Sequence, residues 1–221
     1  MADPRRVLVV AAHPDDELLG CGGTLALHTA RGDSVTAVIG SLGRDPDGPQ
    51  PLDSKAALSQ LGVSDVRSLG LPDQAFDTFT LTDVISPLEE IAREIRPNVV
   101  YTHHHDDINR DHQLLFKAVL VITRPTDPWV EAVYSFDTAS STEWGYPRSF
   151  VPDTWVDISE TIDAKLRAMA EYESELRPYP HPRSLEALKN RAEAAGNLCC
   201  LTAAEVFMTV RRIARGGQAL P

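Results

Sequence analysis

Two clusters of ionisable side chains stand out along this 221-residue chain. Residues 13–17 read His-Pro-Asp-Asp-Glu, and residues 103–112 read His-His-His-Asp-Asp-Ile-Asn-Arg-Asp-His. Imidazole and carboxylate groups are common ligands of zinc, and a catalytic zinc site combines three protein ligands with an open position for water. Together the two clusters contain the donor groups that such a site needs.

Each cluster follows a segment that we expect to form a buried strand. Residues 7–12 (VLVVAA) are a continuous apolar run, which is typical of a strand buried on both faces of a parallel sheet. Residues 98–102 (NVVYT) read as another strand. In open α/β sheets ligands bind beyond the carboxyl ends of the strands. The two clusters could therefore converge on one point.

The rest of the chain alternates between strand and helix patterns. Further strands are expected over 35–39, 66–71, 129–136 and 154–158. Helices are expected over 18–31, 54–61, 81–96, 113–122, 160–176 and 184–195. The apolar spacing of residues 204–213 fits either a strand or a helix. This alternation, with the chain length, predicts one α/β domain over residues 1–221 with a Rossmann-like, doubly wound, mostly parallel sheet.

Each cluster has a simpler alternative explanation as a helix cap. Asp15 and Asp16 could cap the helix that starts near residue 18, and Asp111 the helix that starts near His112. Two ligand-rich clusters, both at strand ends, nevertheless favour a metal site. Within the first cluster, Glu17 is expected to serve the first helical turn instead of the metal.

Composition excludes several classes of function. The chain has 32 Asp plus Glu against 21 Lys plus Arg, a net charge of -11, which disfavours binding to nucleic acid. The apolar run at 7–12 is too short to span a membrane. Three cysteines, two of them adjacent at Cys199 and Cys200, make no disulfide framework, so we expect a cytoplasmic protein.

Two common catalytic motifs are absent from the sequence. The glycines at Gly20, Gly22 and Gly23 do not match the dinucleotide fingerprint, because its third glycine position is occupied by Leu25. The serine-hydrolase motif G-x-S-x-G is also missing. A dinucleotide-binding protein and an ordinary esterase are therefore not expected.

The two clusters resemble the signatures of the LmbE-like, or PIG-L, N-acetylglucosamine deacetylases. Residues 13–17 match the first signature, and residues 107–112 (Asp-Ile-Asn-Arg-Asp-His) are similar to the second, Asp-x-Asn/His-x-Asp-His. Weaker similarities extend over most of the chain, at residues 41–44, 70–73, 172–174, 181–183 and 204–207. The resemblance implies an N-deacetylase that hydrolyses the acetamide of an N-acetylglucosamine-like sugar or glycoconjugate.

The resemblance also implies roles for individual residues. His13, Asp16 and His112 would bind one Zn²⁺ per chain, and Asp15 would be the general base. Asp15 and Asp16 are neighbours that point in different directions, so one carboxylate can hold the metal while the other faces water. Asp111 would orient a histidine ligand.

One position departs from the best-known members of this family. Three residues before the last zinc histidine they often carry a histidine, whereas this chain has Asn109. An amide can donate a hydrogen bond to an oxyanion but cannot deliver a proton near neutral pH. The proton donor to the leaving amine is therefore left open between Asp15 and the histidines His104, His105 and His181.

The substrate cannot be deduced from these residues. Arg44 and Asp73, on loops at the active edge of the sheet, are candidates for contacts with substrate hydroxyl or phosphate groups, although both could be ordinary surface residues. His104 and His181 are further candidates. Specificity is expected in the loops 45–53, 74–80 and 137–150.

Two other functions stay open, as does the oligomeric state. The chain could be a metal-dependent amidase acting on a non-sugar amide, or a sugar-binding protein without catalysis. The intact Asp15 argues against the second, because a binding protein has little need for a general base beside a metal.

Overall fold

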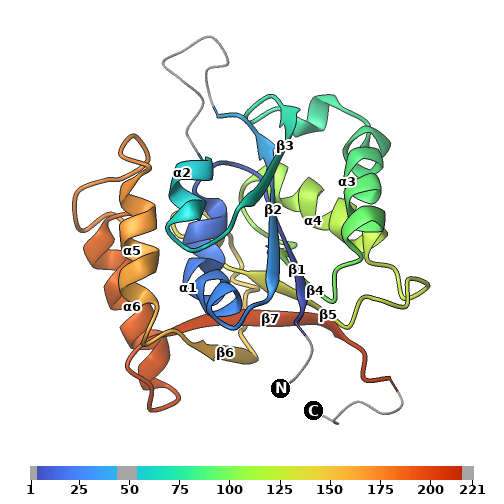
Figure 1. Ribbon diagram of the computed structural model, residues 1–221. Helices are drawn as coiled ribbons and strands as arrows, with labels where there is room; N and C mark the ends of the chain where they lie inside the picture. Colours follow the sequence, from blue (N-terminus) through green and yellow to red (C-terminus); the bar gives the residue numbers. More distant parts are fainter. Residues whose placement is uncertain (1–3, 44–53, 216–221) are drawn as a thin grey trace.

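One seven-stranded sheet forms the centre of the protein in the computed structural model, which describes residues 4–43 and 54–215 (Figure 1). Its strand order is β3-β2-β1-β4-β5-β7-β6. The strands are β1 (Arg6–Ala11), β2 (Ser34–Ser41), β3 (Asp65–Leu71), β4 (Val99–His103), β5 (Ala132–Phe136), β6 (Thr154–Asp157) and β7 (Ala204–Arg212). Strands β1 to β5 are parallel, and β7 runs antiparallel to both of its neighbours. The mostly parallel α/β prediction is confirmed, and the undecided segment 204–213 is a strand.

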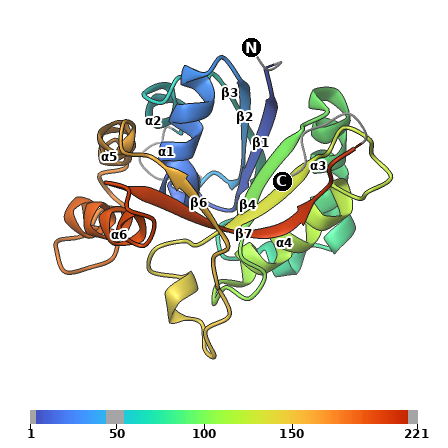
Figure 2. The ribbon, with the colours of Figure 1, turned by 90° about the horizontal axis from the view of Figure 1, so that it is seen from below.

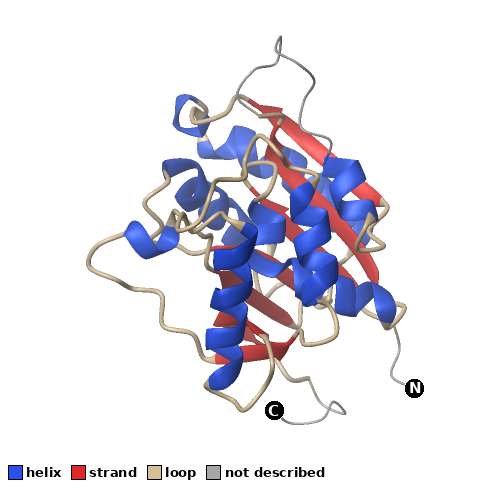
Figure 3. Ribbon diagram, turned by 90° about the vertical axis from the view of Figure 1, so that its left-hand side faces the viewer, coloured by secondary structure: helices blue, strands red, loops and turns tan. Residues whose placement is uncertain are grey.

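Helices cover both faces of this sheet (Figures 2 and 3). They are α1 (Asp16–Ala30), α2 (Ser54–Ser59), α3 (Leu81–Ile95), α4 (Arg110–Ile122), α5 (Ile162–Ala170) and α6 (Leu185–Asn197), with short 3-10 turns at Phe76–Thr78 and Thr142–Trp144. Helices α3 and α4 pack on one face, and α1, α2, α5 and α6 on the other. Among the described residues, no helix has the length and apolar character that crossing a lipid bilayer requires.

The continuous apolar run of β1 reflects burial on both faces. Val7 and Val9 point into the core beneath α1, whereas Leu8 and Val10 point into the core beneath α3 and α4. Successive side chains of a strand alternate between the two faces, so a strand covered on both sides has no exposed positions to fill with polar residues.

The expected helix over 160–176 is shorter in the structure. Helix α5 ends at Ala170, and the chain then turns so that Tyr172 is almost completely buried. The hydroxyl of Tyr172 donates a hydrogen bond to a Glu17 carboxylate oxygen over 2.8 Å. This tertiary contact, which local helix propensity cannot reveal, accounts for the early end of the helix.

The order of the strands places the two ligand-rich clusters together. Strand β1 lies between β2 and β4, with Ala11 opposite Ile39 on one side and Val10 opposite Thr102 on the other. Where the connections from neighbouring strands of a parallel sheet leave in opposite directions, a crevice opens at the carboxyl ends of these strands. The residues that follow β1 and β4 meet in this crevice.

Helix α1 packs very closely against β5, which leads to a stability prediction. A Cβ atom on Gly20 would lie 2.2 Å from the Phe136 ring. We expect Gly20→Ala to lower the free energy of unfolding by about 1–3 kcal/mol through overpacking, as measured by urea denaturation. The control is Gly22→Ala, whose Cβ would come no closer than 3.3 Å to a neighbouring side chain, that of Lys165. Equal losses in the two variants would contradict this explanation.

Candidate active site

A polar pocket of about 210 Å³ lies at the carboxyl ends of the central strands. Its wall is formed by the residues after β1 that lead into α1, those after β2 and β3, the start of α4, the loop after β5 and the loop after α5. The side chains that line it include His13, Asp15, Asp16, Asp73, Gln74, Asn109, His112, Ser141, Glu175, Arg177 and Arg183. Both clusters singled out in the sequence therefore contribute to one cavity.

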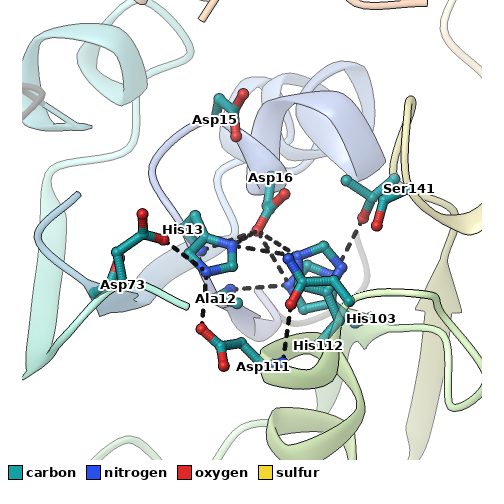
Figure 4. Close-up of polar contacts among 12 residues, drawn as sticks. Ala12, His13, Asp15, Asp16, Asp73, His103, Asp111, His112 and Ser141 are labelled. Atoms are coloured by element: carbon teal, nitrogen blue, oxygen red, sulfur yellow. Dashed lines mark hydrogen bonds and ion pairs between the residues drawn. The ribbon is translucent and has the colours of Figure 1, made fainter. Parts of the chain in front are cut away.

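Three side chains in this pocket present their donor atoms to one point (Figure 4). The Asp16 Oδ2 atom lies 3.2 Å from His13 Nδ1 and 3.2 Å from His112 Nε2, and the two nitrogens are 3.3 Å apart. Tetrahedral zinc with bonds of roughly 2.0–2.1 Å requires ligand atoms about 3.3 Å from one another. The described geometry therefore fits a divalent metal ion bound by these three residues.

A carboxylate also contacts the far nitrogen of each of these histidines. Asp111 Oδ2 is 3.1 Å from His13 Nε2, and Asp107 Oδ1 is 3.3 Å from His112 Nδ1. Asp111 also accepts the Phe76 N–H, and Asp107 accepts the Ser141 hydroxyl. Carboxylates in this position orient metal-binding histidines and select their tautomer. The contact expected of Asp111 is present, whereas Asp107 was not identified from the sequence, although it begins the second signature.

The contact with Asp107 can be tested through metal affinity. Asp107→Asn should weaken zinc binding about 10–100-fold. The amide would orient the His112 ring less firmly than the carboxylate does, and would stabilise less the tautomer whose Nε2 is free to bind the metal. Competition with a chromophoric chelator measures this affinity. The neighbouring exposed residue provides the control: Asp106→Asn should bind zinc as tightly as the wild type. An unchanged affinity in Asp107→Asn would show that the contact is unimportant for the metal.

The same contacts hold protons on both histidines when no metal is bound. Burial lowers the pKa of His13, but hydrogen bonds with Asp111 and Asp16 outweigh burial and raise it to about 10. Burial likewise opposes the rise at His112, where the charge of Asp16 and the contact with Asp107 raise the pKa to about 9. A metal ion must displace these protons in order to bind.

Zinc binding at pH 7 should therefore release about two protons per chain. Because both pKa values are raised, protons compete more strongly at lower pH, and the zinc affinity should increase with pH up to about 10, the higher of the two values. Calorimetric titrations in buffers of different ionisation enthalpy measure the number of protons released. A binding enthalpy that is the same in every buffer would contradict this expectation.

Asp15 has an unusual backbone conformation beside the cluster of His13, Asp16 and His112. Its φ of 104° lies in a region that residues other than glycine rarely adopt. Its N–H donates to Glu17 Oε2 over 3.2 Å, which agrees with a structural role for Glu17. In Figure 4 the Asp15 carboxylate lies apart from the contacts that Asp16 makes with the histidines. Burial, and then the charge of Asp16, raise the pKa of Asp15 well above its usual value, while Arg183 opposes this rise.

His103 packs against the metal-binding cluster as a neutral ring. It is fully buried and stacks on His112 with ring centres 3.8 Å apart. Its Nε2 accepts the Ala12 N–H over 2.8 Å, so the proton is on Nδ1, which faces the Thr138 hydroxyl at 3.2 Å. Burial and the neighbouring His112 lower the pKa of His103 to about 3. Because the ring lone pair of His103 already accepts the Ala12 N–H, the ligand positions are left to His13 and His112.

Two amides and one carboxylate form another wall of the pocket. Asn109 caps α4 by accepting the Asp111 N–H and donates from Nδ2 to Gln74 Oε1 over 3.3 Å. The Gln74 amide nitrogen lies 3.3 Å from Asp73 Oδ1 and 3.3 Å from His13 Nε2. Gln74 lies in a loop that the sequence marked only as a specificity region. Amide N–H groups therefore lie beside the proposed metal ligands.

Two of the expected substrate contacts lie outside the pocket lining. His104 is buried, and its Nε2 is 2.8 Å from the Ser149 hydroxyl, because it points to the opposite face of the chain from His103. His181 is partly exposed and meets Trp144 edge-on. Asp73 does line the pocket, whereas Arg44 and the loop 45–53 lie outside the described residues.

The loop after α5 adds residues that the sequence did not single out. Glu175, Arg177 and Arg183 line the pocket. Arg183 belongs to the segment 181–183, which had been noted only for its resemblance to a family landmark. No spacing rule connects these residues to Asp15, because the tertiary structure brings them together.

Comparison with known proteins agrees with this geometry. The model of the PIG-L family, described as GlcNAc-PI de-N-acetylase, matches residues 8–123, more than half of the chain. The chain belongs to the PIG-L family. The matched region contains His13, Asp16 and His112, whereas Glu175, Arg177 and Arg183 lie beyond it.

Several relatives are similar to this chain over most of their length. The uncharacterized deacetylase YaiS of Escherichia coli is 30% identical over 76% of this chain and 90% of its own. A probable N-acetyl-alpha-D-glucosaminyl L-malate deacetylase 2 of Bacillus cereus is 28% identical, over 77% and 84%. The crystal structure of the conserved protein TT1542 from Thermus thermophilus superposes with a TM-score of 0.78 and 26% identity, covering 98% of this chain and all of that one. Homologues of this chain include deacetylases of N-acetylglucosamine-type substrates, and deacetylases hydrolyse amide C–N bonds.

Proposed function

We propose that this protein is a zinc-dependent N-deacetylase that hydrolyses the acetamide of an N-acetylglucosamine-like sugar or glycoconjugate to the free amine and acetate. One observation carries the proposal. Three donor atoms, 3.2–3.3 Å from one another, stand in a polar pocket beside a further carboxylate, Asp15, that takes no part in the cluster. The membership of the PIG-L family supports the same reaction. We also propose that residues 1–221 form one domain, because strands from both ends of the chain share one sheet.

Zinc is the metal that these residues favour. His13 and His112 supply imidazole nitrogens and Asp16 a carboxylate oxygen, a set that suits a catalytic zinc ion with one open position. When bound, zinc lowers the pKa of a water molecule to about 7 and stabilises negative charge that develops on an oxygen atom.

Asp15 is proposed to carry the proton in both directions. Its carboxylate would accept a proton from the attacking water and then deliver it to the leaving amine. Burial and the charge of Asp16 raise the pKa of Asp15, so the protonated form is accessible closer to neutral pH. The neighbouring pocket amides of Asn109 and Gln74 cannot transfer a proton near neutral pH.

Asn109 and Gln74 are proposed to stabilise the oxygen of the acetamide carbonyl. Each has an amide nitrogen at the pocket wall, and the two side chains are joined by one hydrogen bond that restricts their orientation. Fixed N–H donors directed at a developing oxyanion lower the barrier of acyl transfer. This arrangement would compensate in part for the absence of a histidine at position 109.

The pocket limits the size of the substrate group that enters. Its volume of about 210 Å³ is below the roughly 300–1,000 Å³ of pockets that enclose drug-sized ligands. We propose that one N-acetylated sugar ring enters, with Asp73 contacting its hydroxyl groups, while any remaining part of the substrate stays outside. Arg44, which lies outside the described residues, stays a candidate for such a contact from the sequence alone.

A panel of N-acetylated compounds tests this proposal. The zinc-loaded protein should release acetate from N-acetylglucosamine derivatives, and mass spectrometry should find the free amine. N-acetylated amino acids, as non-sugar amides, should react much more slowly. Preferential cleavage of those amides would instead indicate a different amidase, and zinc binding without any acetate release would indicate a sugar-binding protein.

A further inference from the structure

The Asp15 carboxylate has a single charged partner in the described part of the chain. Arg183 Nη1 lies 3.3 Å from Asp15 Oδ2 and 2.8 Å from Glu175 Oε2. The side chain of Asp15 is 5% exposed and that of Arg183 is 23% exposed. Arg183 is thus the one cationic group within 4 Å of the Asp15 carboxylate among residues 4–43 and 54–215.

The orientation of Asp15 requires such a partner. Its carboxylate is buried, and the charge of the Asp16 carboxylate repels it. The backbone at Asp15, with φ of 104°, is also in a conformation that local preferences disfavour. The backbone preference of Asp15 and the neighbouring Asp16 charge therefore do not by themselves hold the Asp15 carboxylate in one position.

The segment that carries Arg183 is itself firmly fixed. The Arg183 N–H donates to His181 Nδ1 over 3.1 Å. The next residue, Ser184, caps α6 by accepting the Ala187 N–H over 3.0 Å. Arg183 Nη1 also donates to Glu175 Oε2 over 2.8 Å. The position of Arg183 is therefore set by the start of a helix and by an ion pair, both independent of Asp15.

The same segment also holds the Asp15 backbone. The Tyr172 hydroxyl donates to Glu17 Oε1 over 2.8 Å, and Glu17 Oε2 accepts the Asp15 N–H over 3.2 Å. Residues 172–184 thus contact Asp15 at two points, at its N–H through Glu17 and at its carboxylate through Arg183. Two-point attachment fixes both the backbone conformation and the direction of the side chain.

We propose that Arg183, supported by Glu175, is a positioning residue that holds the Asp15 carboxylate toward the pocket and balances its charge. This inference rests on the proposed deacetylase function and on Asp15 as its general base. It follows that a segment outside the residues matched by the family model completes the active site. Because Arg183 also lines the pocket, a direct substrate contact is the competing explanation.

Kinetics of Arg183→Gln separate these explanations. We expect kcat for acetate release to decrease about 100-fold, the effect of a misplaced catalytic group, while KM changes less than about threefold. Zinc content and the urea midpoint should stay as in the wild type. The control is Arg167→Gln, an exposed arginine on α5, which should have wild-type kinetics. Methylguanidinium should restore part of the activity of Arg183→Ala, because it returns the missing cation.

A double-mutant cycle tests whether Arg183 acts through Asp15. The variant Asp15→Asn/Arg183→Gln should be no slower than Asp15→Asn alone, since the group that Arg183 positions is already lost. Additive losses, or a higher KM with unchanged kcat in Arg183→Gln, would overturn the proposal in favour of a direct substrate contact. Loss of zinc or of stability in Arg183→Gln would overturn the proposal, because Arg183 would then serve to stabilise the structure.

A second measurement does not depend on activity. In a crystal structure of zinc-loaded Arg183→Gln, the Asp15 carboxylate should be displaced or divided between two conformers, compared with zinc-loaded wild type. An Asp15 side chain in the same position in both structures would overturn the inference. If the wild type released no acetate, the proposed function would fail, yet this comparison would still decide whether Arg183 positions Asp15.

Discussion

Asp15→Asn should lower kcat for acetate release by about 10²–10⁴-fold while zinc stays bound at one ion per chain. The amide is nearly the same size as the carboxylate, so the pocket and the metal-binding atoms of His13, Asp16 and His112 are retained. What is lost is the group that accepts and returns the proton. Steady-state kinetics and elemental analysis of the same sample measure both quantities.

The control for this experiment is Asp77→Asn, which neutralises an exposed carboxylate on the 3-10 turn Phe76–Thr78. It should retain wild-type kinetics. If Asp15→Asn kept more than about a tenth of the wild-type kcat, another residue would have to be the base.

Asp15→Gly provides an independent test of the backbone strain. Glycine adopts a φ near 104° without a steric penalty, so the strain at this position would be relieved. We expect this variant to be as inactive as Asp15→Asn but at least as stable as the wild type in urea, despite losing the contact with Arg183. A clearly less stable protein would show that the ion pair outweighs the strain.

His112→Ala should remove both zinc and activity, in contrast to Asp15→Asn. Loss of one of three protein ligands leaves the metal with His13 and Asp16 alone, and we expect the zinc affinity to decrease by two or more orders of magnitude. The truncation also leaves Asp107 facing a cavity. Chelator competition measures the affinity, and acetate release should be at background.

His105→Ala provides the matched comparison, because it removes an exposed imidazole from the same histidine-rich segment. This variant should retain its zinc. If instead His112→Ala bound zinc as tightly as the wild type, the ligand set would have to be sought elsewhere, for example in the second cluster formed by His13, Asp73 and Asp111.

The parallel core of the fold could be predicted from the sequence, because its causes are local. The apolar run of β1 requires burial on both faces, and a parallel sheet covered by helices is the architecture that provides it. Strands alternating with helices then place the residues after β1 and β4 at the same edge. Residue type and position after a strand indicated the two clusters, and the resemblance to a known signature then singled out His13, Asp16 and His112 as the expected metal ligands.

Contacts within the site were less predictable, because they depend on side-chain directions. His103 and His104 are adjacent and alike in the sequence, yet one packs against the metal-binding cluster and the other points to the opposite face, toward Ser149. Asp107 could be recognised as the partner of His112 only once the loop after β5 was placed beside it.

The feature that the sequence alone determined is the set of donor groups at the ends of β1 and β4, since buried strands and their alternation with helices follow from patterns of a few residues. Only the tertiary structure decided what surrounds Asp15. Arg183 is 168 positions from Asp15 along the chain, and Tyr172, whose hydroxyl donates to Glu17, is 155 positions from Glu17. Contacts at such separations leave no periodic or spacing signal, because they form only when the loop after α5 packs over the carboxyl end of the sheet.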